Sequence, residues 1–341
     1  CGKTARTVLR GVYLQLFKRL KKGVNLLMEN LLFSLNATIP IFLLMVVGYF
    51  LNKMNILDDT LASKLNSFVF KVSLPLLLFV DVSKSNFKDL WDTKFVVFCV
   101  VSTLISILLS ILFSLRLKDK AIQGEFIQAC YRSSAALLGL ALTSNIYPDV
   151  GVAPLMLMSV VFVYNVVSVV ILSFFKAEQS KVDYKKTFIG ILKNPLILGI
   201  VIGVLVSLLP FKLPQVINKT ISMIASTATP LGLMAMGATF DFDQAKGELK
   251  PSLFCTFMKL IGFCTIFLPI AALLGFRNQA LVAILIMCGS STTVSGFVMA
   301  KSMGHKGVLT SSVVMLTTLL SAFSITFWLT ILKSFGLIQL T

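Results

Sequence analysis

The chain has 341 residues, of which 57% are hydrophobic and 13% charged, and its formal net charge is +17. A soluble globular domain carries roughly 25% charged residues, so this composition excludes an ordinary soluble enzyme, a disordered chain and a fibrous protein. Because a helical membrane span needs about 20 mostly apolar residues, we expect an all-α polytopic membrane protein whose partner is the lipid bilayer. The cations lie in short connections without interleaved aromatic residues, which argues against nucleic acid as a partner.

Residues 1–27 differ from the rest of the chain, because they contain seven cations and no acid. One interpretation is a basic amphipathic helix that lies on the membrane surface. The interpretation that we favour is a leader outside the native protein, with Met28 as the true start. Without this segment the net charge falls from +17 to +10.

Ten apolar runs follow, and we expect each to cross the bilayer as a helix. They form a first five-span repeat over 28–175 and a second over 194–341, joined by a cytoplasmic linker at 176–193. One set of connections holds about twice as many cations as the other, so both termini are predicted outside the plasma membrane if Met28 is the start; the seven cations of the leader would cancel this bias. The predicted spans are 31–52, 62–82, 94–115, 125–147, 153–175, 194–210, 214–240, 251–274, 277–300 and 308–337.

The two halves match at a nearly constant offset. Pro75 and Pro230 lie 155 residues apart, and the serine pair at 133–134 lies 157 residues before the pair at 290–291. Since each half has an odd number of spans, the second half enters the membrane in the opposite orientation. Inverted repeats are a recurrent architecture of secondary transporters, whose binding site lies near the bilayer midplane. A duplicated scaffold without transport is the alternative.

Small hydroxyl residues interrupt the fourth span at 133–134 and the ninth at 290–293. We expect helix breaks there, since irregular backbone inside a membrane survives only in protein or around a wet cavity. The positive N-terminal ends of broken helices favour an anionic group of a substrate. The alternative is helix packing through small residues, for which Gly199 and Gly203 are better candidates.

From Met28 to its end, the chain resembles the auxin efflux carrier family of permeases. The matching stretches are KNPLILGIVIGVLVSLLPFKLP, ATPLGLMAMGATF, VYNVVSVVIL around Asn165 and SGFVMAKSMG. The resemblance implies broken, crossing fourth and ninth spans, and a scaffold of spans one, two, six and seven that faces a mobile bundle. Family members commonly carry Arg-Gly-Asn and then proline in the fourth span, and proline in the ninth. Here residues 132–134 read Arg-Ser-Ser, and Ala141 and Ser291 stand at the two proline positions.

Four of the polar side chains inside the predicted spans bear on function. Lys71 is near the centre of the second span, where an unpaired cation costs on the order of 3 kcal/mol, so we expect it to face the cavity. It would act there as a substrate counter-ion, or else bond carbonyls freed near Pro75. Arg132 either clamps a carboxylate or lies near the cytoplasmic interface. We expect Lys259 to snorkel toward the cytoplasmic boundary, and Asn165 suits either substrate contact or an interhelical bond.

The leading hypothesis is a secondary carrier that moves a small organic anion, a mono- or dicarboxylate, by alternating access. A sensor that binds the anion without transporting it is the alternative, and a channel is a further class. An enzyme is disfavoured, because the spans hold no histidine or carboxylate pair for acid–base work. The candidate substrate-binding residues are Lys71, Pro75, Arg132, Ser133, Ser134, Asn165, Pro230, Ser290, Ser291, Thr292 and Thr293.

No metal or cofactor is expected, because His305 and the cysteines lack ligand spacing. The cysteines within apolar runs are expected to be small buried residues. The absence of acids deep in the spans argues against a cation antiporter. The sequence leaves open a homodimer and the choice of proton or sodium as coupling ion. The cysteines in question are Cys99, Cys130, Cys255, Cys264 and Cys288.

Overall fold

The structure, a computed structural model, describes part of the chain, within which it is all-helical. The leader predicted at 1–27, the first part of the linker at 176–183, and Ala141 lie outside the described residues. The described residues are 28, 31–32, 34–36, 38–83, 92–135, 143, 146–147, 152–175, 184–208 and 213–339.

Eight helices in this part of the chain are long and apolar enough to cross a membrane. They coincide with eight of the predicted spans. Of the other two, the fourth is described only in part and the sixth is a shorter helix, α9 (Pro195–Ser207). The eight helices are Ser34–Lys53, Asp59–Ser83, Thr93–Ser114, Ala153–Phe174, Gln215–Ala238, Leu249–Leu273, Asn278–Ser302 and Val308–Ser334.

Several of these helices consist of more than one segment. The second contains α2, a π-helical turn η1 and α3, and a later one contains α13, a π-helical turn η2 and α14. Together with α9, the helical elements, including short ones outside the eight spans, are α2 (Asp59–Phe68), η1 (Val69–Ser73), α3 (Leu74–Ser83), α4 (Thr93–Ser114), α5 (Gln123–Tyr131), α7 (Ala153–Phe174), α8 (Tyr184–Leu192), α10 (Gln215–Ser226), α11 (Ala228–Ala238), α12 (Phe242–Gly247), α13 (Leu249–Phe257), η2 (Met258–Gly262), α14 (Phe263–Leu273), α15 (Asn278–Gly289), α16 (Val294–Ser302) and α17 (Val308–Ser334).

The polarity of α4 is the reverse of that in a soluble protein. Its inner face carries Ser102, Ser106 and Ser110, all buried, with the hydroxyls of Ser106 and Ser110 donating to the carbonyl four residues earlier at 2.8 and 2.7 Å. Its outer face carries Leu104 and Leu108, which are 49% and 56% exposed. Exposed leucines in a row are stable against lipid tails, and the serines satisfy their own hydrogen bonds within the helix. The helix therefore fits a bilayer environment.

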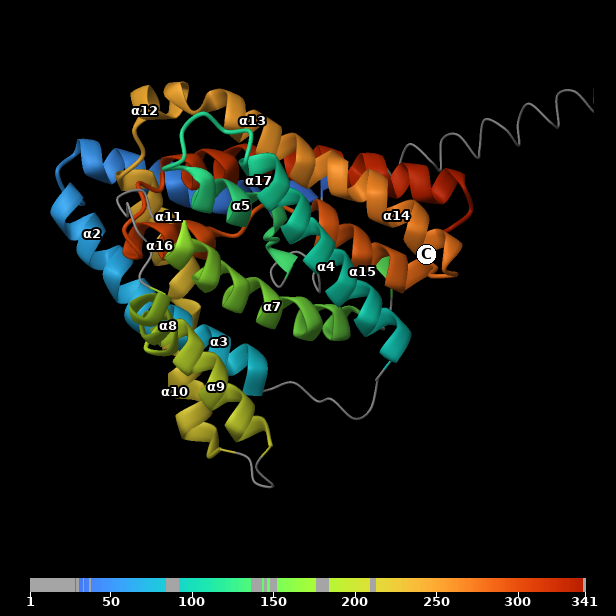
Figure 1. The fold of residues 1–341 in the computed structure, drawn as a ribbon, viewed down its shortest axis with the longest axis horizontal. Helices are drawn as coiled ribbons and strands as arrows, with labels where there is room; N and C mark the ends of the chain where they lie inside the picture. The colour runs from blue at the N-terminus through green and yellow to red at the C-terminus, as the bar shows by residue number, and fades with distance from the viewer. Residues whose placement is uncertain are drawn as a thin grey trace, which may run out of the picture.

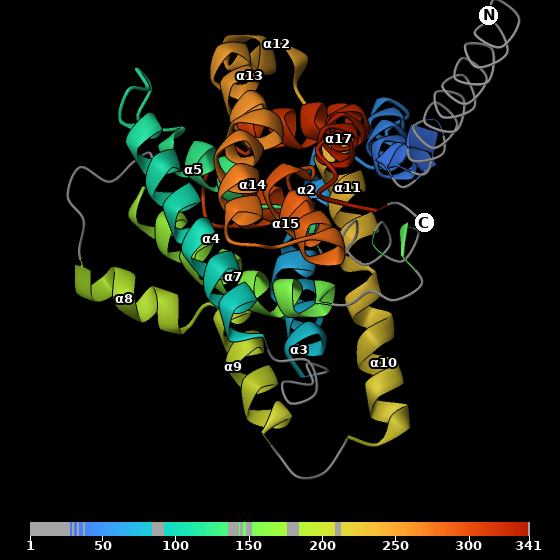
Figure 2. The same ribbon diagram turned by 90° about the vertical axis from the view of Figure 1, so that its right-hand side faces the viewer.

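Glycines allow two pairs of helices to approach closely. A Cβ at Gly199 would lie 2.5 Å from the carbonyl oxygen of Pro75, so α9 packs directly on α3. A Cβ at Gly237 would lie 1.9 Å from the carbonyl oxygen of Met45, which puts α11 against the helix Ser34–Lys53. Small-residue packing is thus confirmed for Gly199. Figure 1 and Figure 2 show α3, α9 and α10 grouped at one end of the molecule.

The apolar core has two large parts. One is formed mainly by α4, α7, α14 and α15, and the other by α3, α9, α11 and α16. α7 contributes to both, with Leu155 in the first and Leu172 in the second. The helix thus links the two packed groups.

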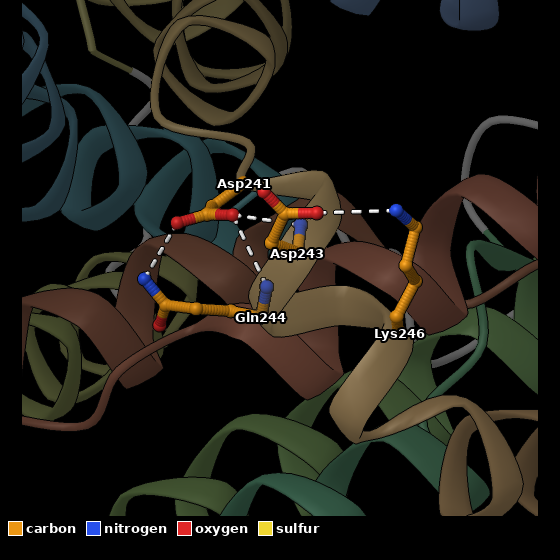
Figure 3. A network of polar contacts seen from close by, with 4 residues as sticks. All are labelled: Asp241, Asp243, Gln244 and Lys246. Carbon is orange, nitrogen blue, oxygen red and sulfur yellow. Dashed lines mark hydrogen bonds and ion pairs between the residues drawn. The ribbon is translucent and has the colours of Figure 1, made fainter.

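The short helix α12 lies in the connection between α11 and α13 (Figure 1), and Figure 3 shows the polar contacts at its start. The Asp241 carboxylate accepts bonds from the backbone N–H groups of Asp243 and Gln244, at 2.8 and 3.1 Å, and from the Gln244 side chain at 2.8 Å. These bonds, chiefly that of the Gln244 backbone, lower the pKa of Asp241. Lys246 pairs with Asp243 at 3.1 Å. Asp241 therefore acts as an N-cap that fixes the start of α12.

Candidate functional site

Two helices stop inside the protein at the predicted serine-rich positions. α5 ends before Arg132, whose backbone is extended with φ −78° and ψ 124°. α15 ends before Ser290, extended with φ −77° and ψ 165°, and α16 begins at Val294. The backbone N–H of Ser134 donates to the carbonyl of Ser291 at 2.8 Å. A backbone hydrogen bond thus joins the two interruptions.

The backbone around these breaks finds further partners in buried side chains. The N–H of Thr292 donates to Oγ1 of Thr317 at 3.0 Å, and the Thr292 hydroxyl donates to the carbonyl of Ala129 at 2.8 Å. The hydroxyl of Ser133 donates to the carbonyl of Met287. Non-helical backbone inside a membrane protein requires such partners, and the small hydroxyl residues supply them.

Lys259 lies at the same junction. Its side chain is 0% exposed, and Nζ donates to the carbonyls of Tyr131 and Met287, at 3.3 and 3.4 Å, and to the hydroxyl of Ser133. The prediction that Lys259 snorkels to the cytoplasmic boundary is therefore wrong. The physical reason is that both breaks leave carbonyls at a helix C-terminus without an intrahelical partner, and these attract a cation.

Arg132 is also buried, at 3% exposure. Its guanidinium donates to Oδ1 of Asn165, to Oγ of Ser295 at 2.8 Å and to Sδ of Met299 at 2.7 Å. Asn165 is held in turn by its own bond to the carbonyl of Val161 at 2.8 Å. Among the described residues no carboxylate lies within 4.0 Å of the guanidinium. The positive charge is surrounded by uncharged groups.

Arg132 and Asn165 line a cavity of about 300 Å³. Its lining comes from α3, α7 and α11 and from the two helix breaks. Its size is at the lower end of the range typical of small-molecule sites. The lining residues are Leu74, Leu77, Leu78, Asp81, Arg132, Ser133, Ser134, Val161, Tyr164, Asn165, Ala228, Thr229, Thr293, Val294 and Ser295.

The structure brings five of the eleven predicted site residues into this lining, and the other six lie elsewhere. Lys71 is in η1 with its side chain exposed, so the expectation that it faces the cavity is corrected. Pro75 packs against Gly199, and Pro230 lies half-buried within α11. The remaining three are buried in the second break, where the hydroxyl of Thr292 bonds to backbone and that of Ser290 has no partner among the described residues. They are Ser290, Ser291 and Thr292.

Sequence reasoning missed four polar residues of the lining, Asp81, Tyr164, Thr229 and Ser295. Asp81 lies seven residues after Leu74 and three after Leu78, so a single face of α3 carries all three. That spacing is the signal that could have found it. Tyr164 lies one residue before Asn165 on α7 and points its hydroxyl at the carbonyl of Met287, 3.4 Å away.

The described residues contain no group of three or more His, Cys, Asp or Glu side chains that could hold a metal ion. The buried character predicted for the five cysteines within the apolar runs is confirmed. The site therefore consists of one arginine, one aspartate, amide and hydroxyl groups, and aliphatic walls.

Comparison with known proteins agrees with this architecture. The chain is similar to the uncharacterized transporter YfdV of Escherichia coli K12, at 24% identity over 253 residues, which cover 72% of this chain and 78% of that protein. It is also similar to an uncharacterized transporter of Methanothermobacter thermautotrophicus, at 21% identity over 305 residues, which cover 88% of this chain and 98% of that protein. The membrane transport protein family matches residues 33–329. The chain therefore belongs to this family of transporters, the auxin efflux carrier family that the sequence resemblance indicated, and is a multi-pass membrane protein.

Proposed function

We propose that the protein is a secondary transporter that moves a small organic anion, a mono- or dicarboxylate, across the plasma membrane. The observation that carries this proposal is the buried Arg132 guanidinium in the cavity wall, held only by Asn165, Ser295 and Met299 among the described residues. A charge taken out of water is costly unless it is paired. The planar fork of arginine matches a carboxylate, so an anionic ligand would supply the missing charge.

The start of α16 supports the same ligand class. Thr293, Val294 and Ser295 line the cavity where this helix begins. The first N–H groups of a helix carry a partial positive charge, which favours an anion. The hydroxyls of Thr293 and Ser295 bond to each other at 3.1 Å, and Ser295 accepts from Arg132, so one hydroxyl hydrogen of this pair is left to donate to a ligand.

We further propose that the ten predicted spans form two inverted repeats, with the boundaries 28–175 and 194–341 and both termini outside. The bond between Ser134 and Ser291 supports this arrangement, because these two residues occupy equivalent positions in the two halves. A pseudo-two-fold axis through the crossing would bring equivalent residues together in this way. α3 and α11 would belong to the scaffold, and motion of the bundle against them would expose the cavity to each side in turn.

The proposal is tested by counterflow into proteoliposomes that contain the purified protein, with labelled mono- and dicarboxylates. We expect saturable counterflow of at least one carboxylate, and a loss of about tenfold or more in its kcat/KM for Arg132→Gln, since 1.4 kcal/mol corresponds to a factor of ten. Lys71→Gln is the matched control and should leave counterflow unchanged, because that side chain is exposed outside the cavity.

Normal counterflow by Arg132→Gln would overturn the role of the guanidinium. Binding of a carboxylate without counterflow, seen as a thermal shift, would favour the non-transporting sensor. Flux that fails to saturate would favour a channel.

A further inference from the structure

Lys259 lies where the breaks of two helices meet, and its environment resembles a cation-binding site. In transporters with broken helices, the carbonyls of unwound backbone and the C-terminal ends of half-helices commonly coordinate Na⁺. We infer that the ammonium group of Lys259 is a built-in cation that takes this place, so that the carrier binds and moves its anion without Na⁺. Only the statement that the carrier moves its anion without Na⁺ rests on the proposed transport function. Cation binding at the Lys259 position is measurable by itself.

The acceptors around Nζ belong to both half-helices. Tyr131 is the last residue of α5, and Met287 lies in the last turn of α15. Their carbonyls accept from Nζ at 3.3 and 3.4 Å, and the Ser133 hydroxyl is the third acceptor. An ammonium group has three donors and no acceptor, so these three oxygens satisfy it completely.

No carboxylate of the described residues lies within 4.0 Å of Nζ to neutralise the Lys259 charge. The compensating charge is the partial negative charge at the C-terminal ends of α5 and α15, which both point at the ammonium. Without the ammonium, three oxygen acceptors would face one another in a buried space. Such an oxygen-lined space is the environment that a hard metal cation prefers.

The same contacts connect Lys259 to the anion site. Tyr131 and Ser133, which accept from Nζ, are the two residues that flank Arg132 in the chain. Lys259 therefore fixes the extended backbone from which the Arg132 guanidinium reaches the cavity. In a carrier that uses Na⁺ this positioning would depend on ion binding, whereas here it is permanent. Lys259 is thus a positioning residue.

The test measures cation binding directly on purified protein in detergent. Unfolding is followed by intrinsic fluorescence in NaCl and in choline chloride at equal ionic strength, and ²²Na⁺ binding is measured by scintillation proximity. Wild-type protein should show no Na⁺-specific shift and no saturable ²²Na⁺ binding. Lys259→Ala should lose thermal stability and then gain a Na⁺-specific rise of at least about 2 °C.

Propylammonium provides a second readout, because it replaces the deleted end of the side chain together with its N–H donors. It should raise the melting temperature of Lys259→Ala, whereas tetramethylammonium, which has no N–H, should not. Lys259→Arg keeps a cation and should remain insensitive to Na⁺. Lys71→Ala, which removes an exposed lysine from the other π-helical turn, is the matched control and should gain neither response.

Saturable ²²Na⁺ binding by the wild-type protein would overturn the inference, and so would a folded Lys259→Ala variant that responds to neither Na⁺ nor propylammonium. If no Lys259 variant folds, the wild-type ²²Na⁺ measurement decides. These readouts need no transported anion, so they separate failure of this inference from failure of the proposed function. Where counterflow is observed, replacing Na⁺ with choline should leave its rate unchanged.

Discussion

The backbone N–H of Ser134 lies 2.8 Å from the carbonyl oxygen of Ser291 and donates to it, although 157 residues separate the two in the chain. Both residues are buried, at 8% and 2% exposure. One helix break therefore completes the hydrogen bonding of the other. It follows that neither half of the chain can form the cavity wall alone, since Arg132 depends on a backbone that the second half holds in place.

Proline at these two positions should have unequal effects. Ser134→Pro removes the donor and leaves the buried carbonyl of Ser291 without that partner, which should lower the free energy of unfolding by about 1–3 kcal/mol. Ser291→Pro keeps the carbonyl, and the extended Ser290 before it is the conformation that proline requires of its predecessor. Melting temperatures in detergent, followed by tryptophan fluorescence, should fall clearly for the first variant and little for the second. A larger fall for Ser291→Pro would contradict this account.

The sequence predicts the depth of a side chain in a span better than its direction. The breaks were predictable because serines and threonines interrupt apolar runs, and the cavity does lie there. The two lysines were placed incorrectly, and both lie in π-helical turns, Lys71 in η1 and Lys259 in η2. A π-helical turn contains one extra residue, which rotates everything after it by about 100° relative to a regular helix. A helical wheel drawn from the sequence cannot include that rotation.

Packing between segments far apart in the chain accounts for the rest of the difference between the prediction and the structure. The Lys259 side chain finds carbonyl acceptors at the ends of α5 and α15, which lie more than a hundred residues before it and 28 residues after it in the chain. The second half of the fourth predicted span lies largely outside the described residues. The division into two repeats therefore stays a prediction.

Glu125 should be the strongest polar anchor of α17. Its carboxylate accepts from the N–H groups of Gly307 and Thr310, at 2.8 and 3.0 Å, and from the Thr310 hydroxyl at 3.0 Å. It is 1% exposed and lies at the positive end of a long helix. Glu125→Gln removes the charge and one acceptor oxygen, which should cost about 1.5–3 kcal/mol of unfolding free energy.

The control for Glu125 is Asp119→Asn, which alters an exposed carboxylate that accepts a single backbone bond from Ala121 at 2.8 Å. Melting temperatures of the two variants in the same detergent give the comparison. Equal stability of Glu125→Gln and the wild-type protein would show that the carboxylate does not anchor α17.

Gly237 should tolerate no side chain. A Cβ there would lie 1.9 Å from the carbonyl oxygen of Met45, and backbone cannot move aside as a flexible side chain can. Gly237→Ala should therefore separate α11 from the helix Ser34–Lys53 and cost about 1–3 kcal/mol or more. Gly190→Ala on α8 is the matched control, because no atom lies within 4 Å of its Cβ position. It should be neutral or stabilising, since alanine favours a helix by about 1 kcal/mol over glycine. Similar melting temperatures for the two variants would contradict the close packing.

Glu248 should make stability depend on pH in the direction opposite to that usual for a carboxylate. It lies between α12 and α13, outside the membrane spans, with Oε2 buried and without a hydrogen-bond partner among the described residues. Burial, reinforced by the charges of Glu125 and Asp119 and opposed by Lys306, raises the pKa of Glu248 to about 7. In the unfolded chain the group titrates near its ordinary pKa of 4.5.

Between these two pKa values the folded protein binds more protons than the unfolded chain, so its stability falls as the pH rises. The free-energy cost of holding the Glu248 carboxylate ionised in the folded protein is absent below pH 4.5 and fully present above pH 7. Glu248→Gln should therefore melt at a higher temperature than wild type at pH 8, and at the same temperature near pH 4.5. The comparison variant Asp241→Asn should act in the opposite sense, because the lowered pKa of Asp241 gives stability that disappears as the pH falls. Melting curves of the three proteins from pH 4 to 8.5 provide the measurement, and a Glu248→Gln profile parallel to that of the wild-type protein would contradict the assignment.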